Sequence, residues 1–352
     1  IGKSILGYEQ NESTMYKLEF NSEASMKQFT KWFQAIKNGG YSTSKKRMSL
    51  DQLDYFVESE LFEADNTYVK RFMNDLNIKG STQLNITLEK ANQTKHYEKY
   101  EHLSRCDYVF TVPYQALEPI ESDEILPIKM LSWDIETTCD GESFSNKECD
   151  AVIQISAHYT VMKNGEWTNE DAIVYMIGSS NSIQGGDALD KYGIKGITKS
   201  YEREEQMILG FWKDLVKKSP DIITGYNDGS FDWPYIRHRA KKLGLYFFDY
   251  FGKSVNKKSY AYSSVLQSAQ MGALTVKNSI TPGVIHWDLL QYLRKNVPGL
   301  DGYSLNAVSL QWLENSQKED IKYLDIPQYQ KTIQGRTKLA SYCLLDSILV
   351  SE

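Results

Sequence analysis

Two acidic residues in the stretch 131–137 are the first whose types and spacing could do chemistry. Asp134 and Glu136 are two positions apart, and in a β-strand such residues project from the same face. Two neighbouring carboxylates repel each other unless a cation lies between them, and their oxygens suit Mg²⁺ or Mn²⁺. The spacing favours a metal site; the alternative is a strand that simply runs out into solvent.

A third carboxylate, Asp232, follows an apolar segment. Residues 221–224 predict a short strand, residues 225–229 a turn, and Pro234 the first position of a helix. Trp233 precedes the proline and is therefore biased away from helical geometry. We expect Asp232 on the connection at the carboxyl end of a strand, where open α/β sheets bind ligands. The alternative is an acid that only favours a helix N-terminus.

A fourth carboxylate, Asp346, lies in a predicted helix over residues 336–349, in an otherwise apolar stripe without a basic residue. A buried carboxylate without a partner is unfavourable, and a metal ion would compensate for it. The hydroxyl of Tyr342, one turn earlier, could hold a water near that metal. The alternative is a solvated Asp346 on a differently phased helix. The stripe comprises Leu339, Tyr342, Cys343, Asp346 and Val350.

Together these residues suit two-metal hydrolysis of a phosphodiester. In that chemistry one metal generates hydroxide from water, and the other stabilises the leaving 3′ oxygen. The candidate residues are Asp134, Glu136, Asp232, Asp346 and Tyr342.

The elements that must position them follow an α/β pattern in residues 126–352. The predicted strands are 128–136, 151–159, 172–177 and 221–224. The predicted helices are 201–218, 234–243, 303–313 and 336–349. This order suggests an α/β layer fold. Residues 1–125 are expected to form a separate N-terminal domain, with helices at 25–36 and 68–76, a helix opening at 49–53 and a strand at 106–112.

Composition limits the class of protein. The 352 residues are 41% hydrophobic and 24% charged, which excludes disordered and collagen-like chains. No apolar run approaches the roughly 18 residues of a membrane helix. The net charge of −6 argues against a protein that coats duplex DNA and leaves only local basic patches. The chain begins without Met or a signal segment, so we expect a piece of a longer protein.

Cysteine and histidine spacing points away from other site types. Four cysteines without a C-x-x-C pair disfavour a disulfide scaffold and favour a reducing compartment. Five histidines without H-x-x-x-H spacing disfavour zinc. Residues 237–258 combine seven basic residues with interleaved aromatic ones, which fits either a single-strand channel or a solvated helix end followed by core aromatics. Asp288 is interpreted as structural.

Three segments resemble, in order, the exonuclease motifs of family B DNA polymerases. Residues 72–80 and 304–309 are similar to the eukaryotic delta-type branch, as are 317–320, and residues 224–234 look most like polymerases of large DNA viruses. The motifs are Asp134-Ile135-Glu136-Thr137, Tyr226-Asn227-x-x-x-Phe231-Asp232 and Tyr342-x-x-x-Asp346.

This resemblance implies an RNase H-like exonuclease domain, with a mixed sheet flanked by helices, preceded by an α+β N-terminal domain. It implies that Asn227 and Phe231 contact the frayed 3′ end and that Tyr342 orients the attacking water. Leu345 stands where delta-type members often carry lysine, which puts cationic help to the phosphate in doubt. The residues implied to bind two Mg²⁺ (or Mn²⁺) ions are Asp134, Glu136, Asp232 and Asp346.

The implied activity is proofreading 3′→5′ exonucleolysis at a single-stranded or mispaired DNA end, in the nucleus or at a viral replication site. The implied partners are the rest of the polymerase chain and a sliding clamp bound through the missing part, with no membrane. Because the chain ends six residues after Asp346, before any palm motif, we do not expect this piece to polymerise. The alternatives are an inactive scaffolding module that binds DNA and a stand-alone RNase H-like exonuclease.

Overall fold

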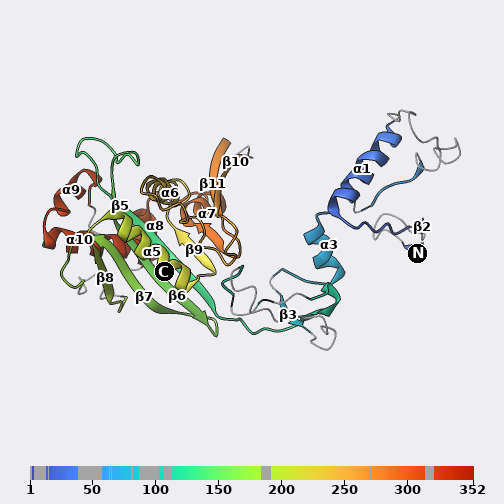
Figure 1. The fold of residues 1–352 in the computed structure, drawn as a ribbon, viewed down its shortest axis with the longest axis horizontal. Coiled ribbons are helices and arrows are strands. Elements are labelled where there is room, and N and C mark those ends of the chain that lie inside the picture. The colour runs from blue at the N-terminus through green and yellow to red at the C-terminus, as the bar shows by residue number, and fades with distance from the viewer. Residues whose placement is uncertain are drawn as a thin grey trace. The chain divides into compact units, whose positions relative to one another are not determined.

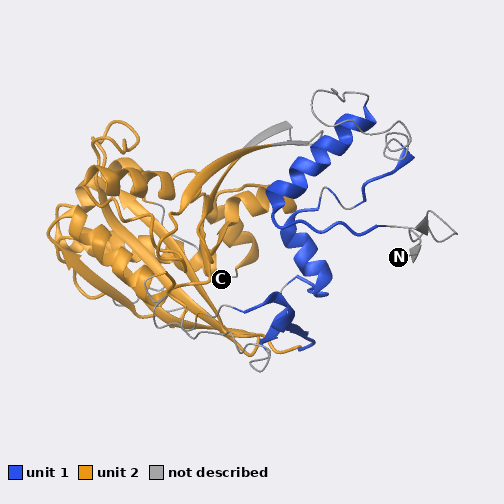
Figure 2. Ribbon diagram, turned by 45° about the vertical axis from the view of Figure 1, so that its right-hand side comes forward, with its two compact units in different colours: residues 1–93, 112–122 blue, residues 94–111, 123–352 orange. Residues whose placement is uncertain are grey.

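The computed structural model describes residues 2–3, 13–14, 16–38, 58–62, 64, 66–80, 82–86, 103–106, 109, 112–183, 192–268, 272–313 and 321–352. The chain divides into two compact units (Figure 2). Unit 1 comprises residues 1–93 and 112–122, and unit 2 comprises residues 94–111 and 123–352. Among the described residues, no helix has the length and apolarity needed to cross a membrane.

Unit 1 contains the two helices predicted for it. Helix α1 spans Glu23–Lys37 and α3 spans Tyr68–Asp75. Each begins after a hydroxyl side chain, Ser22 or Thr67, that accepts a bond from a backbone N–H of the first turn. The predicted helix opening at 49–53 lies outside the described residues. The unit's strands pair antiparallel, β1 (Gly2–Lys3) with β2 (Ser13–Thr14) and β3 (Gln83–Ile86) with β4 (Leu117–Ile120).

The predicted strand over 106–112 is wrong at the residues that the structure describes, because Cys106, Val109 and Val112 lie outside any strand. The segment just before them instead attaches to unit 2. Ser104 forms an isolated antiparallel bridge with Ser254. The guanidinium of Arg105 donates to the carbonyls of residues 250 and 252 at 2.9 and 2.6 Å. These bonds satisfy backbone groups of a distant loop, which sequence pattern does not reveal.

Unit 2 is built on a six-stranded mixed sheet (Figure 1). In spatial order the sheet strands are β12 (Ile285–Asp288), β9 (Ile222–Gly225), β5 (Ile128–Thr137), β6 (Val152–Lys163), β7 (Glu166–Ile177) and β8 (Gly196–Tyr201). Strand pairs β5–β6 and β6–β7 are antiparallel, whereas β12–β9, β9–β5 and β7–β8 are parallel. A separate antiparallel hairpin joins β10 (Tyr260–Ser268) to β11 (Gly272–Ile280).

Helices cover both faces of this sheet. Strand residues such as Trp133 and Tyr175 pack with α5 (Glu204–Lys218) and α6 (Asp232–Lys242) in one buried cluster. On the opposite face, Val174 and its neighbours pack with α10 (Ile333–Ser351). The remaining helical segments are α7 (Leu289–Asn296), α8 (Leu305–Trp312), α9 (Ile326–Tyr329) and the short 3₁₀ turns Tyr114–Ala116 and Tyr323–Asp325.

The prediction that a helix starts at Pro234 is wrong. Helix α6 starts at Asp232, so Trp233 is helical and Asp232 belongs to the helix rather than to the connection. The first helical N–H groups have no partner within the helix, so a proline in the first turn removes no helical bond. The backbone N–H of Trp233 instead donates to the carbonyl of Asp228 at 2.9 Å.

Candidate active site

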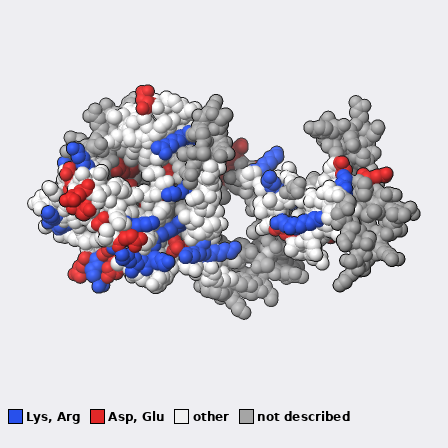
Figure 3. All heavy atoms as spheres, turned by 90° about the horizontal axis from the view of Figure 1, so that it is seen from above, with Lys and Arg blue, Asp and Glu red and all other residues white. Residues whose placement is uncertain are grey.

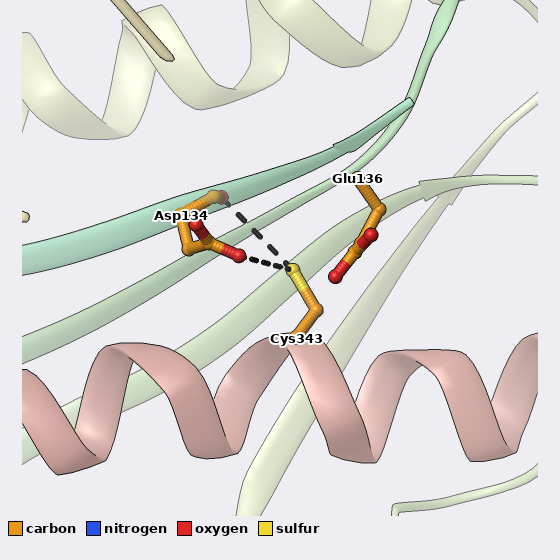
Figure 4. Close-up of side chains that lie close together, drawn as sticks. All are labelled: Asp134, Glu136 and Cys343. Carbon is orange, nitrogen blue, oxygen red and sulfur yellow. Dashed lines mark hydrogen bonds between the residues drawn. The ribbon is translucent and has the colours of Figure 1, made fainter. Parts of the chain in front are cut away.

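Asp134 and Glu136 lie side by side on β5, facing α10 (Figure 4). The buried thiol of Cys343 on α10 lies against them, and one ligand atom from each of the three residues falls within 4.8 Å of the others. Cys343 Sγ is 3.9 Å from Oδ2 of Asp134. Burial, together with the negative charge of Asp134 and Glu136, raises the pKa of the Cys343 thiol well above its usual value. The thiol is therefore protonated at neutral pH.

Asp232, at the start of α6, is 3% exposed. Burial raises the pKa of its carboxyl well above the usual value, and the charge of Asp134 raises it further. Its Oδ1 atom is buried without a hydrogen-bond partner in the part of the chain that the structure describes. Asp232 and Asp134 are thus close enough to repel each other, and a buried acceptor is left open beside them.

Asp346 joins this group from α10. It is 8% exposed, so the interpretation of a solvated residue is wrong. Asp134 and Asp346 line the same cavity of about 180 Å³. Glu136 lines a second cavity, of about 90 Å³, together with Phe231. The structure therefore brings together all four acids that sequence spacing singled out, from β5, α6 and α10.

The four carboxylates fit a divalent metal site. Like charges at this burial cannot all be ionised without a compensating cation, and carboxylate oxygens are the ligands that Mg²⁺ and Mn²⁺ prefer. The open Oδ1 of Asp232 supplies an acceptor that no protein group in the described residues uses. The thiol of Cys343, which lies against Asp134 and Glu136, adds a soft sulfur donor beside these hard oxygen donors.

Tyr342 lies one turn before Asp346 on α10. It packs against the buried cluster of Ile153, Ile326 and Leu339. Ile326 also lines the cavity that contains Glu136. Tyr342 thus packs on a cluster that borders this cavity through Ile326.

Asn227 and Phe231 lie in the loop between β9 and α6. Asn227 adopts a left-handed conformation, with φ of 64°, and its backbone N–H donates to Oδ1 of Asp288 at 3.1 Å. Asp288 also caps α7 through the backbone N–H of Gln291, which is the structural role that the sequence suggested. The ring of Phe231 lies 5.4 Å from that of Phe144, and both line the cavity beside Glu136.

Sequence reasoning missed Asp228, an acid in the same loop. It is 3% exposed and accepts hydrogen bonds from the indoles of Trp133 and Trp233. Burial raises the pKa of Asp228 to about 7, with a further contribution from the charge of Asp288. An acid in a Gly- and Asn-rich turn looks solvated in sequence. Its burial could not be read from the sequence, because Trp133 is 95 positions away and Trp233 five.

Several side chains of the basic segment 237–258 are paired or buried within unit 2. Arg239 makes a buried two-bond pair with Glu204, at 2.9 and 2.6 Å. Arg237 pairs with Asp249 at 3.0 Å, and Lys253 pairs with Asp221 at 2.9 Å. The aromatic residues Phe248 and Phe251 are buried in the core. On the face shown in Figure 3, basic side chains lie among acidic ones.

A six-stranded mixed sheet flanked by helices, with acids gathered from β5, α6 and α10, defines an RNase H-like exonuclease domain. The sequence profile of the family described as DNA polymerase family B, exonuclease domain, matches residues 59–308, which is more than half of the chain. The chain therefore belongs to the exonuclease-domain family of the family B DNA polymerases. Domains of this kind use divalent metal ions.

Three relatives are DNA polymerase delta catalytic subunits. The chain is 30% identical to that of Candida albicans over 99% of this chain and 30% of the relative. It is 33% identical to that of Caenorhabditis elegans, over 82% of this chain and 26% of the relative. It is 31% identical to that of Drosophila melanogaster, over 87% of this chain and 27% of the relative. The chain thus spans less than a third of the length of these relatives.

Proposed function

We propose that residues 126–352 form a proofreading 3′→5′ exonuclease that hydrolyses the terminal phosphodiester of single-stranded or mispaired DNA. The observation that carries this proposal is the buried carboxylate group, in which Asp232 repels Asp134 and keeps one buried oxygen without a hydrogen-bond partner among the described residues. The membership of the chain in the exonuclease-domain family supports the same activity.

In this proposal Asp134, Glu136, Asp232 and Asp346 hold two Mg²⁺ or Mn²⁺ ions. When bound, the ions supply a hydroxide from water and stabilise the leaving 3′ oxygen. Tyr342 orients the attacking water by hydrogen bonding.

The DNA end is assigned to the loop before α6. Phe231 offers an aromatic face on which a terminal base stacks, a contact that tolerates any base. The side-chain amide of Asn227 would bind the frayed 3′ nucleotide. The backbone of Asn227 is held in place by its hydrogen bond to Asp288.

The wider setting is also proposed. Residues 1–125 would form an N-terminal domain and residues 126–352 the exonuclease of a delta-type polymerase chain that acts in DNA replication in the nucleus. That longer chain would extend DNA and reach a sliding clamp. The names of the relatives support a replicative polymerase, and they favour the nucleus over a viral replication site.

The test is hydrolysis of a labelled single-stranded oligonucleotide by the 352-residue chain with Mg²⁺. We expect stepwise release of deoxynucleoside monophosphates from the 3′ end and complete loss of release with a chelator. Binding without hydrolysis, both in this chain and in a longer chain that contains it, would instead identify an inactive scaffolding module. The presence of all four carboxylates argues against that alternative.

A further inference from the structure

Asp228 is tied to two tryptophans at once. Its Oδ2 atom accepts the indole N–H of Trp133 at 3.2 Å and that of Trp233 at 3.1 Å. Its backbone carbonyl accepts the N–H of Trp233 at 2.9 Å. A single loop residue therefore links a side chain of β5 to both the side chain and the backbone of α6.

The loop is shaped to bring Asp228 inward. A Cβ atom on Gly225 would lie 2.6 Å from the Cβ of Asp228, so only glycine fits at that position. Asn227 then turns the chain through a left-handed conformation. Asp288 holds the turn from outside by accepting the backbone N–H groups of Asn227 and Gly229, at 3.1 and 3.3 Å.

The two indoles are held firmly by their neighbours. Their ring centroids are 4.4 Å apart. Trp133 stacks on Phe211 with an interplanar angle of 15°, and Trp233 stacks on Phe251 with an angle of 6°. Both tryptophans are 1% exposed. In an interior packed this closely, a shift of one side chain displaces the side chains that contact it.

Each indole is also one peptide bond from a carboxylate of the site. Trp133 directly precedes Asp134, and Trp233 directly follows Asp232. Asp228 itself is not among the residues that line the two cavities of the site. Asp228 reaches the site through the two tryptophans, and its charge also acts directly on Asp232. Replacement of Asp228 by asparagine removes the charge and keeps the acceptor, so it separates these two effects.

We propose that Asp228 is a positioning residue that fixes the separation of Asp134 and Asp232 by holding Trp133 and Trp233 together. This inference rests on the proposed function, which makes Asp134 and Asp232 metal ligands. Removal of a group that orients a metal ligand, without binding the metal itself, typically lowers metal affinity or activity. The role of Asp228 is specific to the geometry of the site, in addition to any contribution to folding.

The experiment compares Asp228→Asn with Asp228→Leu in the 352-residue chain. Asparagine keeps a carbonyl oxygen for both indole N–H groups, whereas leucine keeps the size and removes the acceptor. Mn²⁺ binding is measured by electron paramagnetic resonance without DNA, alongside kcat and KM for a single-stranded oligonucleotide. We expect Asp228→Leu to weaken Mn²⁺ binding and lower kcat by roughly 10- to 100-fold each, with KM unchanged. Asp228→Asn should stay within about threefold of the wild type.

The matched control is Tyr175→Phe, which removes a partly buried hydrogen bond of 2.6 Å from a tyrosine of the same core to Asp214. It should lower Tm and leave Mn²⁺ affinity and kcat unchanged. If Asp228→Leu does not fold, Trp133→Phe and Trp233→Phe each remove one donor while keeping a ring, and both should weaken Mn²⁺ binding.

The outcomes separate the two proposals. If Asp228→Leu folds and binds Mn²⁺ as the wild type does, the positioning role is overturned and the proposed function stands. The same holds if the folded tryptophan variants bind Mn²⁺ as the wild type does. A wild-type chain that binds no Mn²⁺ would overturn the proposed function. Equal losses in Asp228→Leu and Tyr175→Phe would reduce Asp228 to an ordinary structural residue.

Discussion

Cys343 Sγ lies 3.9 Å from Oδ2 of Asp134, although 209 positions separate the two residues in the chain. The contact is made because α10 packs across β5 and β6 on the sheet face opposite α5 and α6. The same helix carries Asp346 into a cavity that Asp134 also lines. The part of the site that holds Asp134, Glu136 and Asp346 is therefore assembled by the docking of α10 on β5, and α6 adds Asp232. Changes on any of these three elements should alter the site.

The first prediction concerns Asp232→Asn. The substitution removes a proposed metal ligand, so the hydrolysis rate should fall by at least ~10³. Because burial and the charge of Asp134 raise the pKa of Asp232 well above its usual value, the ionised form destabilises the metal-free fold. The neutral amide should therefore raise the free energy of unfolding at pH 7. Rates and urea unfolding with and without Mg²⁺ measure both effects.

The matched control is the exposed Asp301→Asn, which should change neither the rate nor the stability. A variant of Asp232 that hydrolyses DNA as the wild type does would remove this residue from the metal site.

The second prediction concerns Tyr342→Phe, which removes only a hydroxyl. The ring keeps its packing against the cluster of Ile153, Ile326 and Leu339. If the hydroxyl positions water, kcat should fall by roughly 10- to 10³-fold while the affinity for DNA stays the same. The control is Tyr329→Phe, because Tyr329 packs on the same cluster. Weaker DNA binding at an unchanged kcat would instead make Tyr342 a DNA contact.

The arrangement of the carboxylates could be predicted because it follows local periodicity. The two-residue spacing placed Asp134 and Glu136 on one face of a strand, and Trp133 and Ile135 are indeed buried on the other. Helical spacing placed Asp346 in line with Cys343, which is the side of α10 that meets β5. Each regularity depends only on the pitch of one element.

What could not be predicted depends on partners far along the chain. Residues 237–258 suggested a DNA channel as readily as a core segment, because the sequence does not reveal that Glu204 and Asp221 neutralise Arg239 and Lys253. The start of α6 at Asp232 could not be predicted from Pro234, because a proline in the first turn of a helix removes no helical hydrogen bond.

The third prediction concerns the reactivity of the cysteines, which are all free thiols. Burial and the surrounding carboxylates raise the pKa of Cys343, so its reactive thiolate is scarce at neutral pH. Cys106 and Cys149 are exposed. Iodoacetamide should therefore label Cys343 at least ~100-fold more slowly than either of them in the native chain. Mass spectrometry of a labelling time course measures the rates, and the difference should vanish in urea. Equal native rates would contradict the burial of α10 against β5.

The last prediction concerns stability in acid. The ring of His158 is buried between Ser351 Oγ, 2.7 Å from Nδ1, and Asn169 Oδ1, 2.9 Å from Nε2. Burial lowers its pKa from 6.5 to about 4. Between these two pH values the unfolded chain binds a proton that the folded chain does not, so the contribution of His158 to stability is present above pH 6.5 and is lost as the pH falls toward 4.

Comparison of the wild type with His158→Gln isolates this effect, because the other buried titrating groups, such as His286 and Asp228, remain in both proteins. When the pH falls from 7 to 4, the free energy of unfolding measured in urea should decrease by up to about 3 kcal/mol more in the wild type than in the variant. The control is Ser156→Ala on the same strand, which removes a buried hydrogen bond to Ser347 of 2.5 Å. It has no titrating side chain, so its deficit should be the same at every pH. A His158→Gln variant that loses as much stability in acid as the wild type would show that the ring is protonated in the folded chain, and with it that β6 and α10 do not exclude water there.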